Sequence, residues 1–246
     1  MTPFVIVAQP RTGSTLVCSL LNSVGGVRAI VEPINPIGHN HHMQPAKGPL
    51  VPQAMLDHIP TVMKILLNQD GLPWNLSNKM AYRAAGFKIM AHQIQALPTP
   101  EDFWRYLAEY KIKVLWILRH NILLQYISDL IVQQTRQAVC WDATPIQTRV
   151  TVNLNKLSES LKRINLEKRY LLDSLEQYNL EYKRLRYESF QHSFKPITGA
   201  LEWLIGERHI LTTKLMKQNS DRLIDRVVNY ADVVRVTREL GFADLI

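Results

Sequence analysis

A short apolar segment followed at once by a loop of small residues and then by an amphipathic helix constrains the fold of this chain more than any other feature. Residues 4–8 read FVIVA, which is typical of a buried strand, and residues 9–15 read QPRTGST, which interrupt any regular hydrophobic period. Leucine and valine side chains then recur at helical spacing from Leu16 to Val24. Strand, loop and helix in this order predict an α/β fold whose first loop points backbone N–H groups at a ligand.

Strand and helix patterns alternate along the rest of the chain, and neither an internal repeat nor a linker divides it. We therefore predict a single domain over residues 1–246 with a mostly parallel central sheet flanked by helices. A leucine stripe between Asn153 and Tyr178 predicts a long helical insertion in the second half, with a core face or an oligomer seam as its use. The expected strands are 27–31, 87–91, 113–118 and 182–187, the expected helices are about 53–68, 75–85, 100–110 and one ending near 138, and a long irregular loop covers 33–52.

Composition excludes several classes of protein. Of the 246 residues 46% are hydrophobic and 20% are charged, which is typical of a globular chain and not of a disordered or collagen-like one. Two cysteines, Cys18 and Cys140, cannot build a disulfide framework, and the apolar runs are shorter than the ~20 residues of a membrane span. The start MTPFVIV lacks the basic region of a signal peptide. We expect a cytoplasmic protein that does not bind a membrane.

The net charge of +8 comes from 29 Lys and Arg residues against 21 Asp and Glu residues, and the excess is spread evenly along the chain. Because no basic tail or basic-aromatic stripe is present, the sequence does not predict nucleic-acid binding. A small polyanionic ligand needs only a few well-placed cations. Glu32 is the only carboxylate before Asp57, so little negative charge opposes such a ligand near the first loop.

The loop at residues 9–15 has the chemistry of an anion site, because a strand-to-helix turn presents free N–H groups and the positive end of the helix dipole. A loop that hydrolyses nucleoside triphosphates would carry glycine at position 8 and lysine at position 14, whereas this chain has Ala8 and Ser14. We therefore expect a phosphate-like anion without triphosphate hydrolysis. The alternative is a turn in which Ser14 and Thr15 only cap the helix.

Two segments resemble the sulfotransferase family that uses 3′-phosphoadenosine 5′-phosphosulfate (PAPS). Residues 10–15, PRTGST, resemble the family's 5′-phosphosulfate loop in the version with arginine as its basic residue. Residues 113–131, KVLWILRHNILLQYISDLI, resemble its 3′-phosphate segment, in which a strand ends in arginine and the next helix carries serine. The pair looks most like the bacterial Stf0-like branch. Shorter similarities follow in the family's order at Glu32-Pro33, 86–90, 187–190 and Lys217-Gln218.

This resemblance implies a P-loop-like α/β fold and a sulfotransferase that moves a sulfuryl group from PAPS to a hydroxyl or amine of a small-molecule or saccharide acceptor. It implies in-line displacement at sulfur, with 3′-phosphoadenosine 5′-phosphate (PAP) as the product and no required metal. By the same resemblance the residues that bind PAPS are Arg11, Thr12, Gly13, Ser14, Thr15, Leu16, Arg119, Ser128, Tyr187 and Lys217.

The chain departs from the family pattern at one position. Counted back from Ser128, His120 stands where the common arginine falls, while Arg119 keeps the first arginine of the doubled pair that is usual in the bacterial form. A histidine side chain is positively charged in acidic solution and mostly neutral above about pH 7. We expect Arg119 to carry the 3′-phosphate contact.

Glu32 is the candidate general base. It follows the expected strand at 27–31, so a parallel sheet brings it to the same edge as the first loop, and the resemblance implies an acidic base in this neighbourhood. A carboxylate near helix N-termini and Arg11 is stabilised in its charged form, as a base requires. The alternative is an ion pair with Arg28 or Arg11 that only orders the loop.

Arg11 and His92 complete the candidate catalytic set. Arg11, with the loop amides, is expected to stabilise charge on the leaving oxygen. His92 and Lys88 come at the end of the expected third strand and are placed at the acceptor site, although a buried histidine that donates to a carbonyl is an equal alternative. The cluster His39-Asn40-His41-His42 suggests metal ligands, but no nearby cysteine or acid supports that, and we favour a loop that faces the acceptor.

Two other classes of protein stay open at this point. A kinase of a small metabolite would need acidic Mg²⁺ ligands, which are scarce near the loop. A non-catalytic nucleotide-binding module would keep the fold and lose the second phosphate site, as His120 allows. The identity of the acceptor and the formation of a homodimer are not predicted by the sequence.

Overall fold

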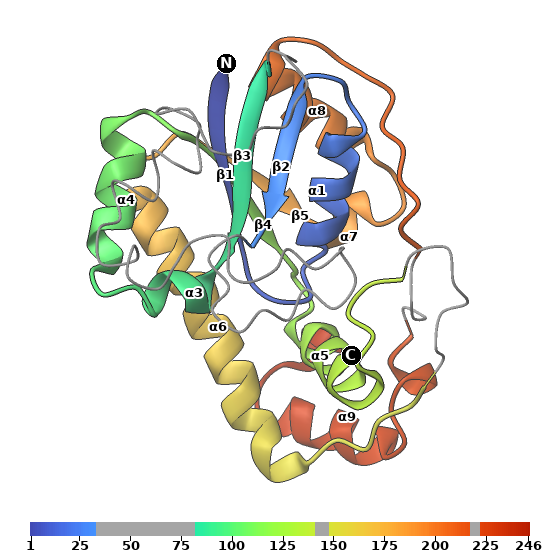
Figure 1. The fold of residues 1–246 in the computed structure, drawn as a ribbon. Coiled ribbons are helices and arrows are strands. Elements are labelled where there is room, and N and C mark those ends of the chain that lie inside the picture. The colour runs from blue at the N-terminus through green and yellow to red at the C-terminus, as the bar shows by residue number, and fades with distance from the viewer. Residues whose placement is uncertain (33–81, 141–147, 217–221) are drawn as a thin grey trace.

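The computed structural model of the chain describes residues 1–32, 82–140, 148–216 and 222–246. Its centre is a five-stranded sheet with the order β2-β3-β1-β4-β5, in which every neighbouring pair is parallel (Figure 1). This confirms the predicted α/β class. The strands are β1 (Thr2–Ala8), β2 (Val27–Val31), β3 (Ala84–Met90), β4 (Lys113–Leu118) and β5 (Tyr182–Arg186).

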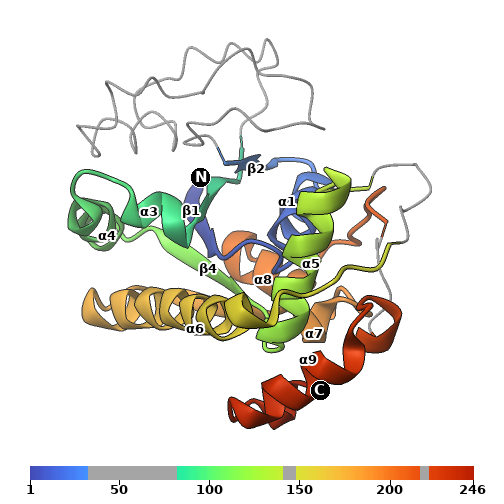
Figure 2. The same ribbon diagram turned by 90° about the horizontal axis from the view of Figure 1, so that it is seen from below.

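Helices cover both faces of the sheet, as Figures 1 and 2 show. One face carries α1 and α8, and the other carries α3, α4 and the C-terminal half of α6. The long helix α6 is the insertion predicted for the second half of the chain. These helices are α1 (Ser14–Asn22), α3 (Ala91–Gln95), α4 (Pro100–Glu109), α6 (Leu154–Gln177) and α8 (Lys195–Ile205).

Strand β1 is apolar throughout because it is covered on both faces. Phe4 and Ile6 pack toward α1 and α8, whereas Val5 and Val7 pack toward α4 and α6, and all four are completely buried. Its neighbour β3 requires glycine at position 86, because a Cβ atom there would lie 2.0 Å from the carbonyl oxygen of Phe4.

A third apolar cluster lies beyond the carboxyl ends of the strands, toward which the arrowheads in Figure 1 point. It joins α5 to the N-terminal half of α6 and to the C-terminal helices. The leucine stripe of α6 therefore packs against the sheet at Leu171 and Leu175 and against α5 at Leu157 and Leu161, which confirms a core face for these residues. The remaining elements are α5 (Ile122–Thr135), α7 (Tyr187–Phe190), η2 (Leu223–Asp225), α9 (Tyr230–Glu239) and η3 (Ala243–Leu245).

The structure corrects the boundaries around β3. This strand begins at Ala84, and residues 82 and 83 before it are not helical, so the helix expected over 75–85 was wrong for all four of its described residues, and the strand expected over 87–91 began too late. Alanine favours helices, but Ala84 and Ala85 are buried between β1 and β2, and this packing outweighs their propensity. Ala91 starts the short helix α3.

Several predictions fall on residues outside the described ranges. They are the loop at 33–52, the helix at 53–68 and most of the helix at 75–85. Within the described part of the chain, no helix combines the length and the apolar character needed to cross a membrane.

Candidate functional site

The predicted ligand-binding segments that follow β1, β4 and β5 leave the sheet at its carboxyl edge, because the strands are parallel. From the central strand β1, the sheet extends to β3 and β2 on one side and to β4 and β5 on the other, so the chain order reverses at β1. Helix α1 covers one face of the sheet, and α3 and α4 cover the other. Such a switch point opens a crevice above the central strand in α/β folds. The loop after β1 is therefore at the position where ligands of this fold class bind.

This loop places the N-terminus of α1 at the sheet edge. Gly13, the residue before α1, has φ 80° and Arg11 has φ 63°, so the backbone turns twice through the left-handed region. The hydroxyl of Thr12 donates to the Gln9 carbonyl at 2.8 Å and closes the turn. The first N–H groups of α1 have no partner within the helix and leave a positive end for an anion.

Two buried glutamine side chains hold the loop in place. Gln9 Nε2 donates to the Ile164 carbonyl at 2.7 Å and lies 3.3 Å from a carboxylate oxygen of Glu167, which ties the loop to the middle of α6. Gln125 Nε2, from α5, donates to the Pro10 carbonyl at 2.9 Å. The sequence analysis missed both residues, although an isolated polar residue at the end of an apolar strand, as Gln9 is, could have indicated such a role.

Arg11 and Ser128, both predicted to bind PAPS, are in direct contact. Arg11 Nε donates to Ser128 Oγ at 3.1 Å, and its Nη1 donates to the Ala138 carbonyl at 2.8 Å. Burial lowers the pKa of Arg11, Asp129 opposes this effect, and the neighbouring Arg119 lowers the pKa further. Because the positive charges of Arg11 and Arg119 repel each other, an anion bound beside them would be stabilised.

Arg119 and Tyr187 also lie against the loop. The Arg119 guanidinium is buried at the end of β4 and stacks over the Tyr187 ring, 4.5 Å from its centroid. Tyr187 starts α7, and its ring contacts Gly13 so closely that a Cβ atom on Gly13 would lie 2.7 Å from a ring carbon. The structure thus brings together residues from three predicted segments: the loop, the end of β4 and the end of β5.

His120 is exposed, and its backbone takes part in a different contact. The amides of His120 and Asn121 donate to the Glu188 carboxylate at 3.0 and 3.1 Å. Asn121 in turn caps α5 by accepting from the Leu124 amide at 2.8 Å. Because Glu188 occupies these amides, an anion near this turn would rely on the side chains of Arg119 and Ser128.

Glu32 forms an ion pair with neither Arg28 nor Arg11 but with Lys88. Lys88 Nζ lies 2.7 Å from Glu32 Oε1 and also donates to Thr15 Oγ1 at 3.1 Å. Lys88 is 1% exposed, and the Glu32 side chain is 19% exposed. The buried Lys88 therefore links Glu32, the candidate base, to Thr15 in the first turn of α1.

Gln93 holds the other oxygen of the carboxylate. Its Nε2 lies 3.3 Å from Glu32 Oε2, while its own oxygen accepts from the Met90 amide at 2.8 Å. The preceding residue His92, on the short helix α3, is exposed and does not join this cluster. The sequence had identified His92 but not Gln93.

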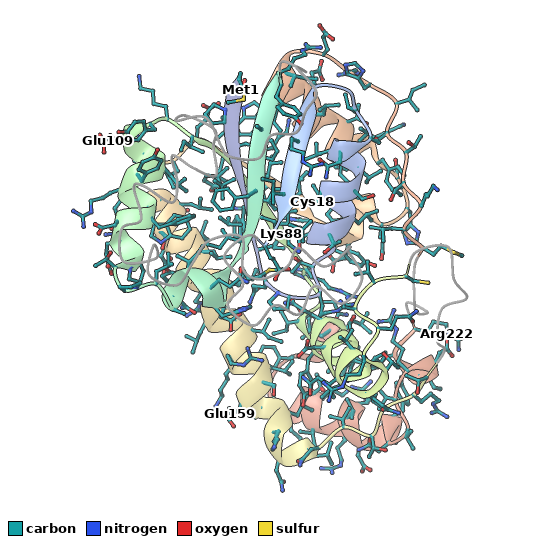
Figure 3. All side chains as sticks on the ribbon, viewed as in Figure 1. Met1, Cys18, Lys88, Glu109, Glu159 and Arg222 are labelled. Atoms are coloured by element: carbon teal, nitrogen blue, oxygen red, sulfur yellow. The ribbon has the colours of Figure 1, made fainter. Side chains whose placement is uncertain are left out.

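Cys18 lies next to the same pair of charges. Figure 3 shows Cys18 and Lys88 close to each other inside the molecule, with Glu109 and Glu159 at its periphery. Burial raises the pKa of the Cys18 thiol to about 11, with Lys88 lowering it and Glu32 raising it. Cys18 is 1% exposed within the apolar cluster of α1 and is therefore a core residue.

Other predicted residues are accounted for more briefly. Leu16 is partly buried and packs against the cluster on the α1 face. Lys217 and the His39–His42 cluster lie outside the described ranges. Among the residues that the structure describes, no group of three or more His, Cys, Asp or Glu side chains is arranged to hold a metal ion.

Comparison with known proteins finds a similar fold among solved structures. Neither the protein-family models nor the curated proteins match this chain. Among solved structures, the fold is similar to that of a sulfotransferase from Alicyclobacillus acidocaldarius, with a TM-score of 0.50 and 11% sequence identity over 98% of this chain and 96% of the other. At this identity the similarity supports the fold alone, which is the predicted P-loop-like α/β fold. Membership of the Stf0-like branch stays a prediction.

Proposed function

We propose that this protein is a PAPS-dependent sulfotransferase that moves a sulfuryl group to a hydroxyl or amine of a small-molecule or saccharide acceptor. The observation that carries the proposal is the contact between Arg11 and Ser128. These residues are 117 positions apart, and each belongs to a segment that resembles one of the two phosphate-binding segments of that family. A turn that only capped a helix would not require them to meet.

The donor site follows from this contact. The N-terminal amides of α1 and the guanidinium of Arg11 would bind the 5′-phosphosulfate, and Arg119 with Ser128 would bind the 3′-phosphate. Tyr187, whose ring carries Arg119 on one face and lies near Arg11, is the proposed adenine contact. The binding residues in this proposal are Arg11, Thr12, Gly13, Ser14, Thr15, Leu16, Arg119, Ser128, Tyr187 and Lys217.

The proposed reaction is a direct displacement at sulfur. The acceptor oxygen attacks sulfur in line with the bond to the leaving phosphate oxygen, and Glu32 takes the acceptor proton. The bond between sulfur and the phosphate oxygen breaks, its electron pair stays on PAP, and Arg11 with the loop amides stabilises this charge. The chain's contribution is positioning and charge stabilisation, and the proposal requires no divalent metal.

The acceptor would enter from the β2 and β3 side of the loop, where Glu32 is partly exposed. His92 lies on α3 at the same edge of the sheet and is exposed, so it remains in the proposal as a contact to the acceptor and as the second candidate for the base. The compartment in which the protein works and its indifference to nucleic acids and membranes stay predictions, and a homodimer is an assembly that the sequence leaves open.

Isothermal titration with PAP, and separately with ATP and Mg²⁺, tests the proposal against the two other classes of protein. Binding of PAP without Mg²⁺, together with weaker binding of ATP, is the expected result. Tighter binding of ATP with Mg²⁺ would favour the kinase. Binding of neither ligand would contradict both enzymes and leave the non-catalytic module.

A further inference from the structure

Lys88 is a charged side chain in the middle of a completely buried strand. Its neighbours Phe87 and Ile89 pack toward α4 and α6, so Lys88 points to the opposite face, toward α1. Burial of an ammonium group is costly unless the charge is paired and hydrogen-bonded. Lys88 is 1% exposed and is paired with Glu32, which makes this cation unusual among the described lysines.

The contacts of Lys88 connect the two halves of the proposed site. One hydrogen of its ammonium group reaches Glu32, the proposed base, and another reaches Thr15, in the anion-binding turn of α1. The carboxylate of Glu32 therefore lies within two hydrogen-bond lengths of the loop that would hold the donor. The charges next to Cys18 are the same two groups.

This proximity creates an electrostatic conflict in the proposed reaction. A carboxylate base and an anionic donor at one sheet edge repel each other, and water screens this repulsion poorly in a buried site. A cation placed between them removes the conflict. Arg11 does not do so, because its guanidinium is directed to Ser128 and Ala138 on the α5 side.

We propose that Lys88 is the positioning residue that compensates the charge of Glu32, so that a carboxylate base and an anionic donor can occupy the same sheet edge. This inference rests on the proposed function. Lys88 was expected at the acceptor site, but it is buried, so its proposed action is through Glu32, whose carboxylate it also orients by binding Oε1. The role is a charge effect, and it therefore depends on the charge of Glu32.

A double-variant cycle measures this dependence through PAP binding. The variants are Lys88→Met, Glu32→Gln and the two combined, and the matched control is Lys113→Met. Lys113 is also a strand lysine, it donates to the Trp203 carbonyl at 2.8 Å, and it starts β4 at the amino end of the sheet. The dissociation constant of PAP is measured by isothermal titration for all four variants and the wild-type chain.

We expect Lys88→Met to weaken PAP binding roughly ten- to a hundredfold, because it leaves Glu32 as an uncompensated charge beside the anion. Adding Glu32→Gln to this variant is expected to restore affinity to within about threefold of the wild-type chain, since the repelling charge is then gone. Glu32→Gln alone should not weaken PAP binding, and Lys113→Met should change it by less than about threefold.

The outcomes separate this inference from the proposed function. A wild-type chain that binds no PAP would overturn the proposed function. A chain that binds PAP but loses the same affinity on Lys88→Met with and without Glu32→Gln, or loses none, would overturn the role of Lys88 alone. If Lys88→Met does not fold, Lys88→Gln takes its place in the same cycle.

Discussion

Arg11→Ala is the substitution whose effects on binding and on folding the structure separates best. The side chain donates to Ser128 and to the Ala138 carbonyl, the second bond being exposed. Loss of both should lower the free energy of unfolding by only about 1–2 kcal/mol, because release of the repulsion with Arg119 partly offsets it. Loss of a charge-assisted contact to the 5′-phosphosulfate position should cost ~1.5–3 kcal/mol of PAP binding, a ten- to hundredfold change in Kd.

A thermal-shift assay with PAP measures both effects. At a PAP concentration of about 100 times the wild-type Kd, binding stabilises the fold by ~2.7 kcal/mol, whereas a variant with Kd weakened roughly thirtyfold keeps only ~0.9 kcal/mol. For a chain of this size these values correspond to increases in Tm of about 5–11 °C and about 2–4 °C. Arg105→Ala, which removes an exposed arginine of α4, is the matched control and should keep the full shift. A folded Arg11→Ala variant with an unchanged PAP shift would refute the assignment of the loop.

Three further substitutions test other parts of the site and the fold. Arg119→Ala should abolish the preference for PAPS over adenosine 5′-phosphosulfate in competition binding, and a preserved preference would place the 3′-phosphate elsewhere. Gly86→Ala should destabilise the fold in urea unfolding by about 3 kcal/mol, the upper end of the usual cost of overpacking, because its Cβ would collide with the carbonyl of Phe4. A loss of less than about 1 kcal/mol would contradict the close approach. Because the pKa of the Cys18 thiol is raised to about 11, the native state keeps its proton when the unfolded chain has lost it, so Cys18 lowers stability as the pH rises toward 11. In a Cys140→Ser background, Cys18→Ala should therefore weaken the loss of stability between neutral and alkaline solution, and an identical loss in both proteins would contradict the raised pKa.

The parts of the fold with a local signal were predictable from the sequence. Strand β4 was expected over residues 113–118 and has these bounds, because a continuous apolar run ends there in Arg119 and a helix-capping Asn121. Helix α4 was expected from a threonine and a proline at its start, and it begins at Pro100. The order of strands and helices then made a parallel sheet the expected arrangement.

The parts that depend on contacts between distant segments were not predictable in the same way. The alternative to a base at Glu32 was an ion pair with Arg28 or Arg11, but its partner is Lys88, which lies on the neighbouring strand β3. The side chain of Gln9 bonds to α6, which comes far later in the sequence. The burial that makes Ala84 a strand residue likewise comes from β1 and β2, and no local pattern around it contains that information.

Transfer of a radiolabelled sulfuryl group from PAPS to a panel of hydroxyl and amine acceptors, by the wild-type chain and by Glu32→Gln, tests the central claim most directly. We expect the wild-type chain to label at least one acceptor, and the Glu32→Gln variant to lose on the order of 10²–10⁴ in kcat while its PAP affinity does not fall. No transfer by a wild-type chain that binds PAP would contradict the proposed activity. Turnover by Glu32→Gln within a few fold of the wild-type rate would contradict the assignment of Glu32 as the base and make His92 the next residue to test.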